Sequence, residues 1–219
     1  MTLVSVRRRL ITFRLAASAS GRNMAVMLAQ GVLALSLAIR IHDAYGVPDE
    51  HLAKARATAE AIMSAAGVSV TWPQCPCLSA VRRDELVVRI TAAAPASTPG
   101  SLGFSFVDTD IKAGTLATVF ADRVQALAAI AGVDDGELLG RVVAHEISHL
   151  LIGTHDHGPR GLMRGEWRTS EVAGQRPSDW VLSLSDGRKI RQAIRRRSAE
   201  SPPTLTIVDA KPSPDVGPQ

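Results

Sequence analysis

The pentapeptide His145-Glu146-Ile147-Ser148-His149 constrains this chain more than any other stretch. On an α-helix, residues four apart lie on one face, so the two imidazoles can each give a nitrogen to a single metal ion. Glu146 lies beside the pair and can reach a water on the same metal. The pattern therefore predicts a helix that carries a zinc site, with Glu146 as its general base.

The residues around this motif indicate a buried helix. Asp134 or Asp135 can cap its start, and Gly153 is a residue type that commonly ends a helix. Apolar residues recur upstream at helical spacing, namely Leu138, Leu139, Val142 and Val143. Four of the six histidines lie between positions 145 and 157, which disfavours an exposed helix with incidental histidines.

Charge is unevenly distributed along the 219 residues, whose formal net charge is +4. Residues 1–23 carry five arginines and no acid, and residues 188–197 carry six basic residues and no acid. The residues between them hold 13 basic and 18 acidic side chains. A nucleic-acid surface needs basic residues on a folded face. A leader and a solvated helix explain the two basic ends more simply, so we expect no nucleic-acid partner.

Residues 1–35 have the features of a leader, either a signal or an anchor. Arginines at the start precede an apolar run, Met24–Ile39, that is shorter than the roughly 20 residues of a spanning helix. Met24 is an alternative start to Met1. Apolar and polar residues also alternate over 35–42, so an export signal and a first strand compete for these positions. We expect an exported or envelope-associated protein, and a cytoplasmic one if this segment is not a signal.

The region from 36 to 197 is expected to form one α+β domain, with a mixed β-sheet backed by two helices, the second of which carries the histidine motif. Expected strands cover residues 35–41, 68–72, 86–90, 104–107 and 115–121. Besides the motif helix, helices are expected over 49–66, 122–131 and 186–197, the last capped by Ser185. Residues 198–219 are rich in proline and polar residues and are predicted to be a disordered tail.

The two cysteines, Cys75 and Cys77, are separated by one proline. A disulfide between them would close a very small, strained ring. Free thiols, metal ligation and pairing with another chain are the alternatives. Two cysteines do not assign a redox compartment.

The motif helix, its glycine end, and the histidine and methionine after it resemble the metzincin clan of zinc endopeptidases. In that clan the third zinc ligand lies six residues after the second motif histidine, which is the position of His155. A methionine then forms a turn under the metal, and Met163 in Gly161-Leu162-Met163-Arg164 is similar. The clan's glycine falls where this chain has Ile152, so Gly153 comes one residue late.

The stretch from His149 to Gly153, with His157-Gly158-Pro159 and the Gly-Leu-Met-Arg sequence, is more similar to a group of compact bacterial metzincin-like proteins. That resemblance spans residues 36–195 and implies His157 as the third zinc ligand beside His145 and His149, with His155 as the alternative. The thermolysin-like clan instead takes an acid from a later helix. Two acids, Glu166 and Glu171, lie near the distance that this option requires.

The resemblance implies a metzincin-like catalytic domain, a zinc-dependent endopeptidase acting on a peptide or protein substrate. We expect the protein to be a monomer. A zinc-bound water would attack the peptide bond, with Glu146 as general base. Two other hypotheses stay open. The four clustered histidines could close a structural zinc site, although such a site needs no base. The chain could also be a membrane-associated binding module that uses its basic ends.

Overall fold

The computed structural model describes residues 35–73, 81–82, 84–94 and 99–200. The expectations about the signal, the alternative start, the two cysteines and the tail beyond Glu200 fall outside these residues and stay predictions. Within the described ranges, no helix combines the length and the apolarity that crossing a bilayer requires.

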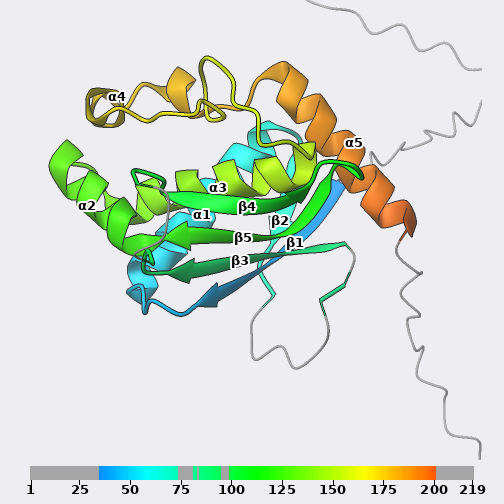
Figure 1. The fold of residues 1–219 in the computed structure, drawn as a ribbon, viewed down its shortest axis with the longest axis horizontal. Helices are drawn as coiled ribbons and strands as arrows, with labels where there is room; N and C mark the ends of the chain where they lie inside the picture. Colours follow the sequence, from blue (N-terminus) through cyan, green and yellow to red (C-terminus); the bar gives the residue numbers. More distant parts are fainter. Residues whose placement is uncertain (1–34, 74–80, 83, 95–98, 201–219) are drawn as a thin grey trace, which may run out of the picture. The chain divides into compact units, whose positions relative to one another are not determined.

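Five strands form one mixed sheet in the order β2-β1-β3-β5-β4 (Figure 1). Four strands run parallel to one another: β1 (Leu35–Asp43), β2 (Val68–Thr71), β3 (Glu85–Thr91) and β5 (Ala113–Phe120). The fifth, β4 (Gly103–Asp108), runs antiparallel to β5 at the edge of the sheet. This arrangement confirms the predicted α+β class with a mixed sheet.

The strands follow the two-residue alternation expected for a sheet with one covered face. Ile39 of β1 pairs with Leu86 of β3, and both side chains are fully buried. Three residues further along, His42 pairs with Arg89 and both are exposed. One face of the sheet therefore builds the core, and the other carries polar side chains, some exposed and two, Arg40 and Glu85, joined in a buried ion pair (2.6 Å).

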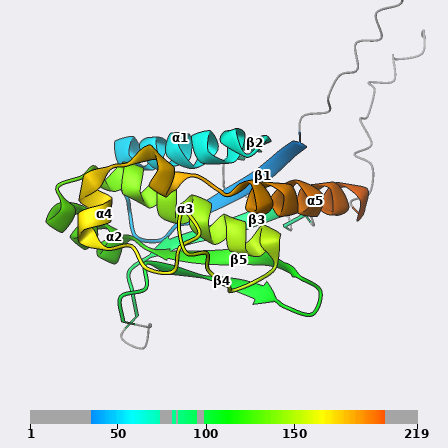
Figure 2. The same ribbon diagram turned by 90° about the horizontal axis from the view of Figure 1, so that it is seen from above.

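Helices α1 (Asp49–Ala65), α3 (Asp135–Ile152) and α5 (Leu184–Glu200) pack together over the core face, as Figure 2 shows from above. The shorter α2 (Ala121–Ala131) leads from β5 into α3. Of these helices α3 is the most enclosed, with 15 of its 18 residues buried. The helix that bears the histidine motif is therefore the centre of the fold.

Both ends of α3 are formed by the residues that the sequence indicates. Asp134 is the N-cap, and its carboxylate accepts a hydrogen bond from the Glu137 N–H (2.8 Å). Gly153 ends the helix with φ +76°, and its N–H donates to the His149 carbonyl (2.9 Å). A Cβ at Gly153 would lie 2.3 Å from the Lys112 carbonyl oxygen, so the β4–β5 turn abuts the helix end.

The helix α1 crosses α3 at backbone contact. A Cβ at Gly140 of α3 would lie 2.4 Å from the Ala55 carbonyl oxygen and 2.7 Å from the Thr58 Cβ. A Cβ at Gly136, one turn earlier, would lie 2.8 Å from the His51 carbonyl oxygen. Glycines at these two positions let the helices touch, and this contact sets the position of α3 above the sheet.

The last third of the described chain differs from expectation. The Ser183 hydroxyl accepts from the Asp186 N–H (3.1 Å), so Ser183 caps α5 and the prediction of Ser185 was wrong. The helix consequently begins at Leu184, two residues earlier than expected. Two short elements not predicted from the sequence precede it, α4 (Thr169–Gly174) and the 3-10 turn η1 (Pro177–Trp180). Each buries a single side chain, too few to produce a periodic pattern.

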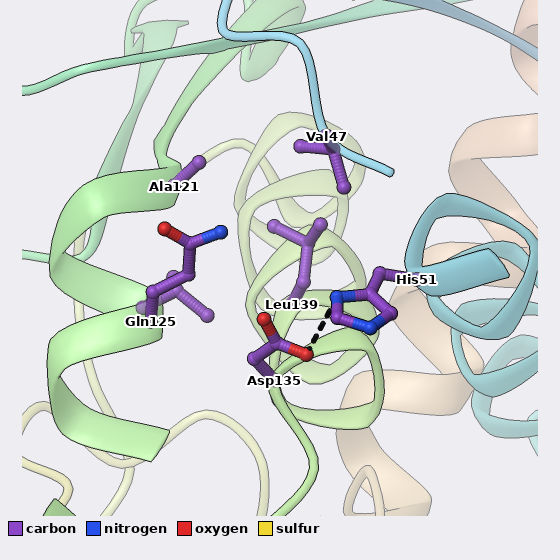
Figure 3. A pocket seen from close by; sticks show the side chains of 7 residues that line it. Val47, His51, Ala121, Gln125, Asp135 and Leu139 are labelled. Atoms are coloured by element: carbon purple, nitrogen blue, oxygen red, sulfur yellow. Dashed lines mark ion pairs between the residues drawn. The ribbon is translucent and has the colours of Figure 1, made fainter. Parts of the chain in front are cut away.

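A small cavity lies where the start of α1 meets α2 and α3. Figure 3 shows His51 and Asp135 at its rim, with Nδ1 and Oδ1 2.9 Å apart. Its volume is about 10 Å³, which is room for one water at most. This cavity is therefore a gap in packing and not a ligand site.

Gly140→Ala should destabilise the protein by about 2 kcal/mol, because the new methyl group meets the α1 backbone and overpacking outweighs the gain in helix propensity. The matched control is Gly174→Ala, where a Cβ has no neighbour within 4 Å. Urea unfolding of both variants measures the difference. Equal stability of the two variants would contradict the close α1–α3 contact.

Candidate metal centre

Three imidazole rings converge on one point beside α3. His145 and His149 come from α3, and His157 comes from the loop that follows it. The Nε2 atom of His149 lies 3.0 Å from Nε2 of His145 and 3.2 Å from Nε2 of His157. The three potential ligand atoms all lie within 4.8 Å of one another.

The other nitrogens of the two helix histidines point to backbone carbonyls. Nδ1 of His145 lies 2.9 Å from the Leu162 carbonyl oxygen, and Nδ1 of His149 lies 2.8 Å from that of Thr154. A carbonyl only accepts, so each Nδ1 carries the proton and each Nε2 presents a lone pair. Two lone pairs 3.0 Å apart repel each other unless a cation lies between them.

The ring geometry fits a metal ion. Two nitrogens bound tetrahedrally to zinc at 2.0–2.1 Å lie about 3.3 Å apart, close to the two Nε2 separations. Burial lowers the pKa of His145 to about 3, and the nearby His149 ring adds to the effect. Burial also lowers the pKa of His149 and of His157. All three rings are thus neutral near pH 7, which is the form that binds metal.

The other candidate ligands are placed differently. His155 is exposed and lines the cleft beside the three rings, but it is not part of the three-histidine group. Glu166 also lines the cleft with an exposed side chain. Glu171 accepts from the Arg168 N–H (3.1 Å) in the first turn of α4. Among the described residues, the structure therefore brings together His145, His149 and His157.

The loop after α3 is anchored at several points. The Leu162 N–H donates to the Val181 carbonyl (2.9 Å), and the Gly158 N–H donates to the Met163 carbonyl (2.7 Å). Arg164 Nη1 donates to the carbonyls of Gly161 (3.0 Å) and Asp179 (2.7 Å). Met163 is buried in this loop. These bonds hold the Leu162 carbonyl against His145 and keep His157 facing α3.

Glu146 lies between α3 and the edge strand β4. The Ser105 hydroxyl lies 2.7 Å from Glu146 Oε2 and 2.8 Å from the Glu146 carbonyl oxygen. A Cβ at Gly103 would lie 2.9 Å from Oε1, so glycine leaves the room that the carboxylate needs. Burial raises the pKa of Glu146 to about 7, and the hydrogen bond from Ser105 opposes this rise. A carboxyl with this pKa can both take up and release a proton near neutral pH.

The structure adds residues that sequence patterns did not indicate. Besides Gly103 and Ser105, Trp167 packs edge-on against His145, with ring centroids 5.6 Å apart, and against Trp180 at 5.1 Å. These residues lie far from the motif in sequence, and their spacing carries no signal. The scarcity of tryptophan, three in the chain, is the one cue that singles out Trp167.

The site opens into a cleft of about 1,080 Å³. Its walls come from β4 and the turn before it, from α2, from α3 and from the loop after α3. Lining residues outside the metal group include Leu102, Phe104, Leu127, Ile130 and Val142. The three rings and Glu146 line this cleft as well, so a ligand can reach them.

No protein-family model and no curated protein matches the chain. Among solved structures it is similar to a zinc-dependent peptidase from Methanocorpusculum labreanum (strain Z), with 16% identity over 71% of this chain and 99% of that chain and a TM-score of 0.47. It is also similar to myroilysin, with 13% identity over 73% of this chain and 92% of that chain and a TM-score of 0.32. Similarities this distant do not identify a chemistry.

His157→Ala should abolish stable zinc binding, because it removes one of three converging rings. His155→Ala is the matched control and should weaken binding by no more than about tenfold, as expected for a residue near the ligands. Zinc titration with a competing chromophoric chelator measures both affinities. A larger loss of zinc affinity in His155→Ala than in His157→Ala, or equally severe losses in both variants, would contradict the three-ring geometry.

Glu146→Gln should stabilise the metal-free protein at high pH. The carboxyl is neutral in both folded and unfolded protein below pH 4.5, so its burial costs little there. Between pH 4.5 and 7 the unfolded state releases this proton while the folded state keeps it, so burial of the carboxyl increasingly lowers the free energy of unfolding. Above pH 7 this loss of stability is constant. The stability gained by the substitution should thus be about 3 kcal/mol larger at pH 8 than at pH 4.5.

Urea unfolding with a chelator present, at both pH values, measures this difference. The control is Glu166→Gln, which replaces an exposed acid of the same cleft. A gain from Glu146→Gln that does not change with pH would mean that burial does not raise the pKa of this carboxyl.

Proposed function

We propose that this chain is a zinc-dependent endopeptidase in which His145, His149 and His157 hold the metal and Glu146 is the general base. The observation that carries the proposal is the convergence of three imidazole Nε2 atoms beside a buried carboxylate, all lining one open cleft. Such a set of groups can activate a water next to a bound substrate.

The donor set favours zinc. Three neutral imidazoles are a common ligand set of catalytic zinc and leave one tetrahedral position open. Bound zinc supplies a Lewis acid for a carbonyl oxygen and an acidified water as nucleophile. Three further features suit the proposed role. The Leu162 and Thr154 carbonyls fix the ring tautomers, and the Ser105 hydroxyl orients the carboxylate.

Glu146 is the proton carrier in this proposal. Its carboxylate accepts a proton from the attacking water and then passes it to the departing amine. The raised pKa suits both steps, since a stronger acid would not accept the proton and a weaker one would not return it. Ser105 keeps Oε2 occupied, which leaves Oε1, beside Gly103, as the oxygen that handles the proton.

The cleft suits an extended peptide. Strand β4 is the edge of the sheet and its residues Gly103 to Ser105 line the cleft, so a peptide can pair with its free edge. Apolar side chains of Leu127, Ile130 and Val142 line the same cleft. This combination favours substrates that present an apolar residue near the cleaved bond.

A closed structural site is less well supported. It would need His155 as a fourth ligand, and this ring lies outside the three-histidine group. A structural site would also gain nothing from a base in a cleft of about 1,080 Å³.

Glu146→Gln should retain about one zinc per chain and lose hydrolysis of unfolded casein by 10²–10⁴-fold, because it removes only the proton acceptor. Glu166→Gln is the matched control, since Glu166 is an exposed acid of the same cleft. It should keep activity within a few-fold of wild type. Metal analysis and initial rates test both variants. Survival of activity in Glu146→Gln, or wild-type protein that binds no zinc, would refute the proposal.

A further inference from the structure

The outer face of α5 is a continuous basic surface. The helix buries Ile190, Ala193 and Ile194 against the core. The opposite face exposes four cations at helical spacing, and the one exposed acid of the helix is Glu200 at its last position. These cations are Arg188, Lys189, Arg195 and Arg196; we call them the α5 basic face.

These four cations play no evident part in holding the fold together. The two other arginines of α5 point inward, where Arg191 donates to the Ala66 carbonyl (2.6 Å) and Arg197 donates to the Gly114 carbonyl. No ion pair joins the α5 basic face to an acid of the described residues. Four like charges lie within nine residues of one helix, so they repel each other and favour an anionic partner.

The α5 basic face lies near Leu35, where the described fold begins, and this position bears on which anionic partner it binds. Leu35 begins β1 and pairs with Val68 of β2. The residue before Val68 is Gly67, and a Cβ there would lie 3.4 Å from Cδ of Arg191 in α5. Figures 1 and 2 both show the start of β1 beside α5. The chain therefore enters the described fold next to this helix.

The sequence that leads to this point is apolar. No charged residue occurs from Met24 to Ala34, the run that precedes β1, and five arginines come before it. A segment of this composition favours a bilayer interface.

The chemistry of the α5 basic face fits anionic lipid. Cations near such a surface are attracted to the headgroup phosphates. Two exposed apolar side chains, Leu184 (85% exposed) at the first position of the helix and Val181 (49% exposed) three residues before it, can insert among the lipid chains. The outer face of α5 carries no aromatic residue for base stacking, so single-stranded nucleic acid fits it less well.

We propose that the α5 basic face docks on an anionic phospholipid membrane, beside the point where the N-terminal apolar segment joins the fold. The surface lies outside the metal centre and the cleft, so this inference is independent of the peptidase proposal.

The test uses the full chain and sedimentation with vesicles of neutral phosphatidylcholine or of phosphatidylcholine with one quarter phosphatidylglycerol. The α5 variant carries Arg188→Gln, Lys189→Gln, Arg195→Gln and Arg196→Gln. The control variant removes the same charge from exposed cations elsewhere, with Arg89→Gln, Lys112→Gln, Arg160→Gln and Arg176→Gln. Near 0.1 M salt the α5 variant should lose at least roughly tenfold in partitioning to the anionic vesicles. The control variant should lose less than threefold.

On neutral vesicles the two variants should partition alike, since no headgroup charge is involved. Unchanged melting temperature and zinc content show that both variants are folded. A double variant, Arg188→Gln with Arg196→Gln, should partition to anionic vesicles less than wild type and more than the α5 variant. Equal losses in the α5 and control variants on anionic vesicles would overturn the proposal. So would a loss of affinity for polyuridylate with no change in lipid partitioning, which would make the face a nucleic-acid surface. Casein hydrolysis should be the same in both variants, so failure here leaves the peptidase proposal standing.

Discussion

Burial of polar groups on α3 is the constraint on which this structure depends. The helix passes through the core, yet it carries two imidazoles and a carboxylate there. An unpaired polar group in such a place costs free energy, so each needs a partner from elsewhere. The Leu162 and Thr154 carbonyls serve the histidines, and the Ser105 hydroxyl serves Glu146. These contacts tie the loop after α3 and the edge strand to the central helix.

The loop that supplies the two carbonyls also carries the third ring. Its path is held by Arg164, whose guanidinium bonds two carbonyls and lies 4.7 Å from the ring centroid of Trp180. Arg141 of α3 lies over the same ring at 4.1 Å. One tryptophan thus stacks with cations from the helix and from the loop. This cluster fixes the path of the loop and with it the position of the His157 ring.

The sequence predicts much of the fold because its signals are local. Asp134 and Gly153 mark the ends of α3, and two-residue alternation marks β1 and β3. Ser183 was missed as the α5 cap because Ser185 satisfies the same local rule. Which histidine of the loop lies beside the two helix histidines depends on the loop's backbone hydrogen bonds, from Leu162 to Val181 and from Gly158 to Met163. No short sequence pattern encodes these bonds.

The residues that contact Glu146 could not be predicted from local sequence patterns either, because they lie on a strand distant in sequence. They also show that the sheet positions the site. Gly103 and Ser105 are two residues apart on β4 and both lie against Glu146, whereas Phe104 between them is exposed and lines the cleft. The Ser105 hydroxyl contacts both the side chain and the main chain of Glu146. A shift of β4 by one residue would place the Phe104 side chain where the carboxylate now lies. The pairing of β4 with β5 therefore determines the position of the Glu146 carboxylate.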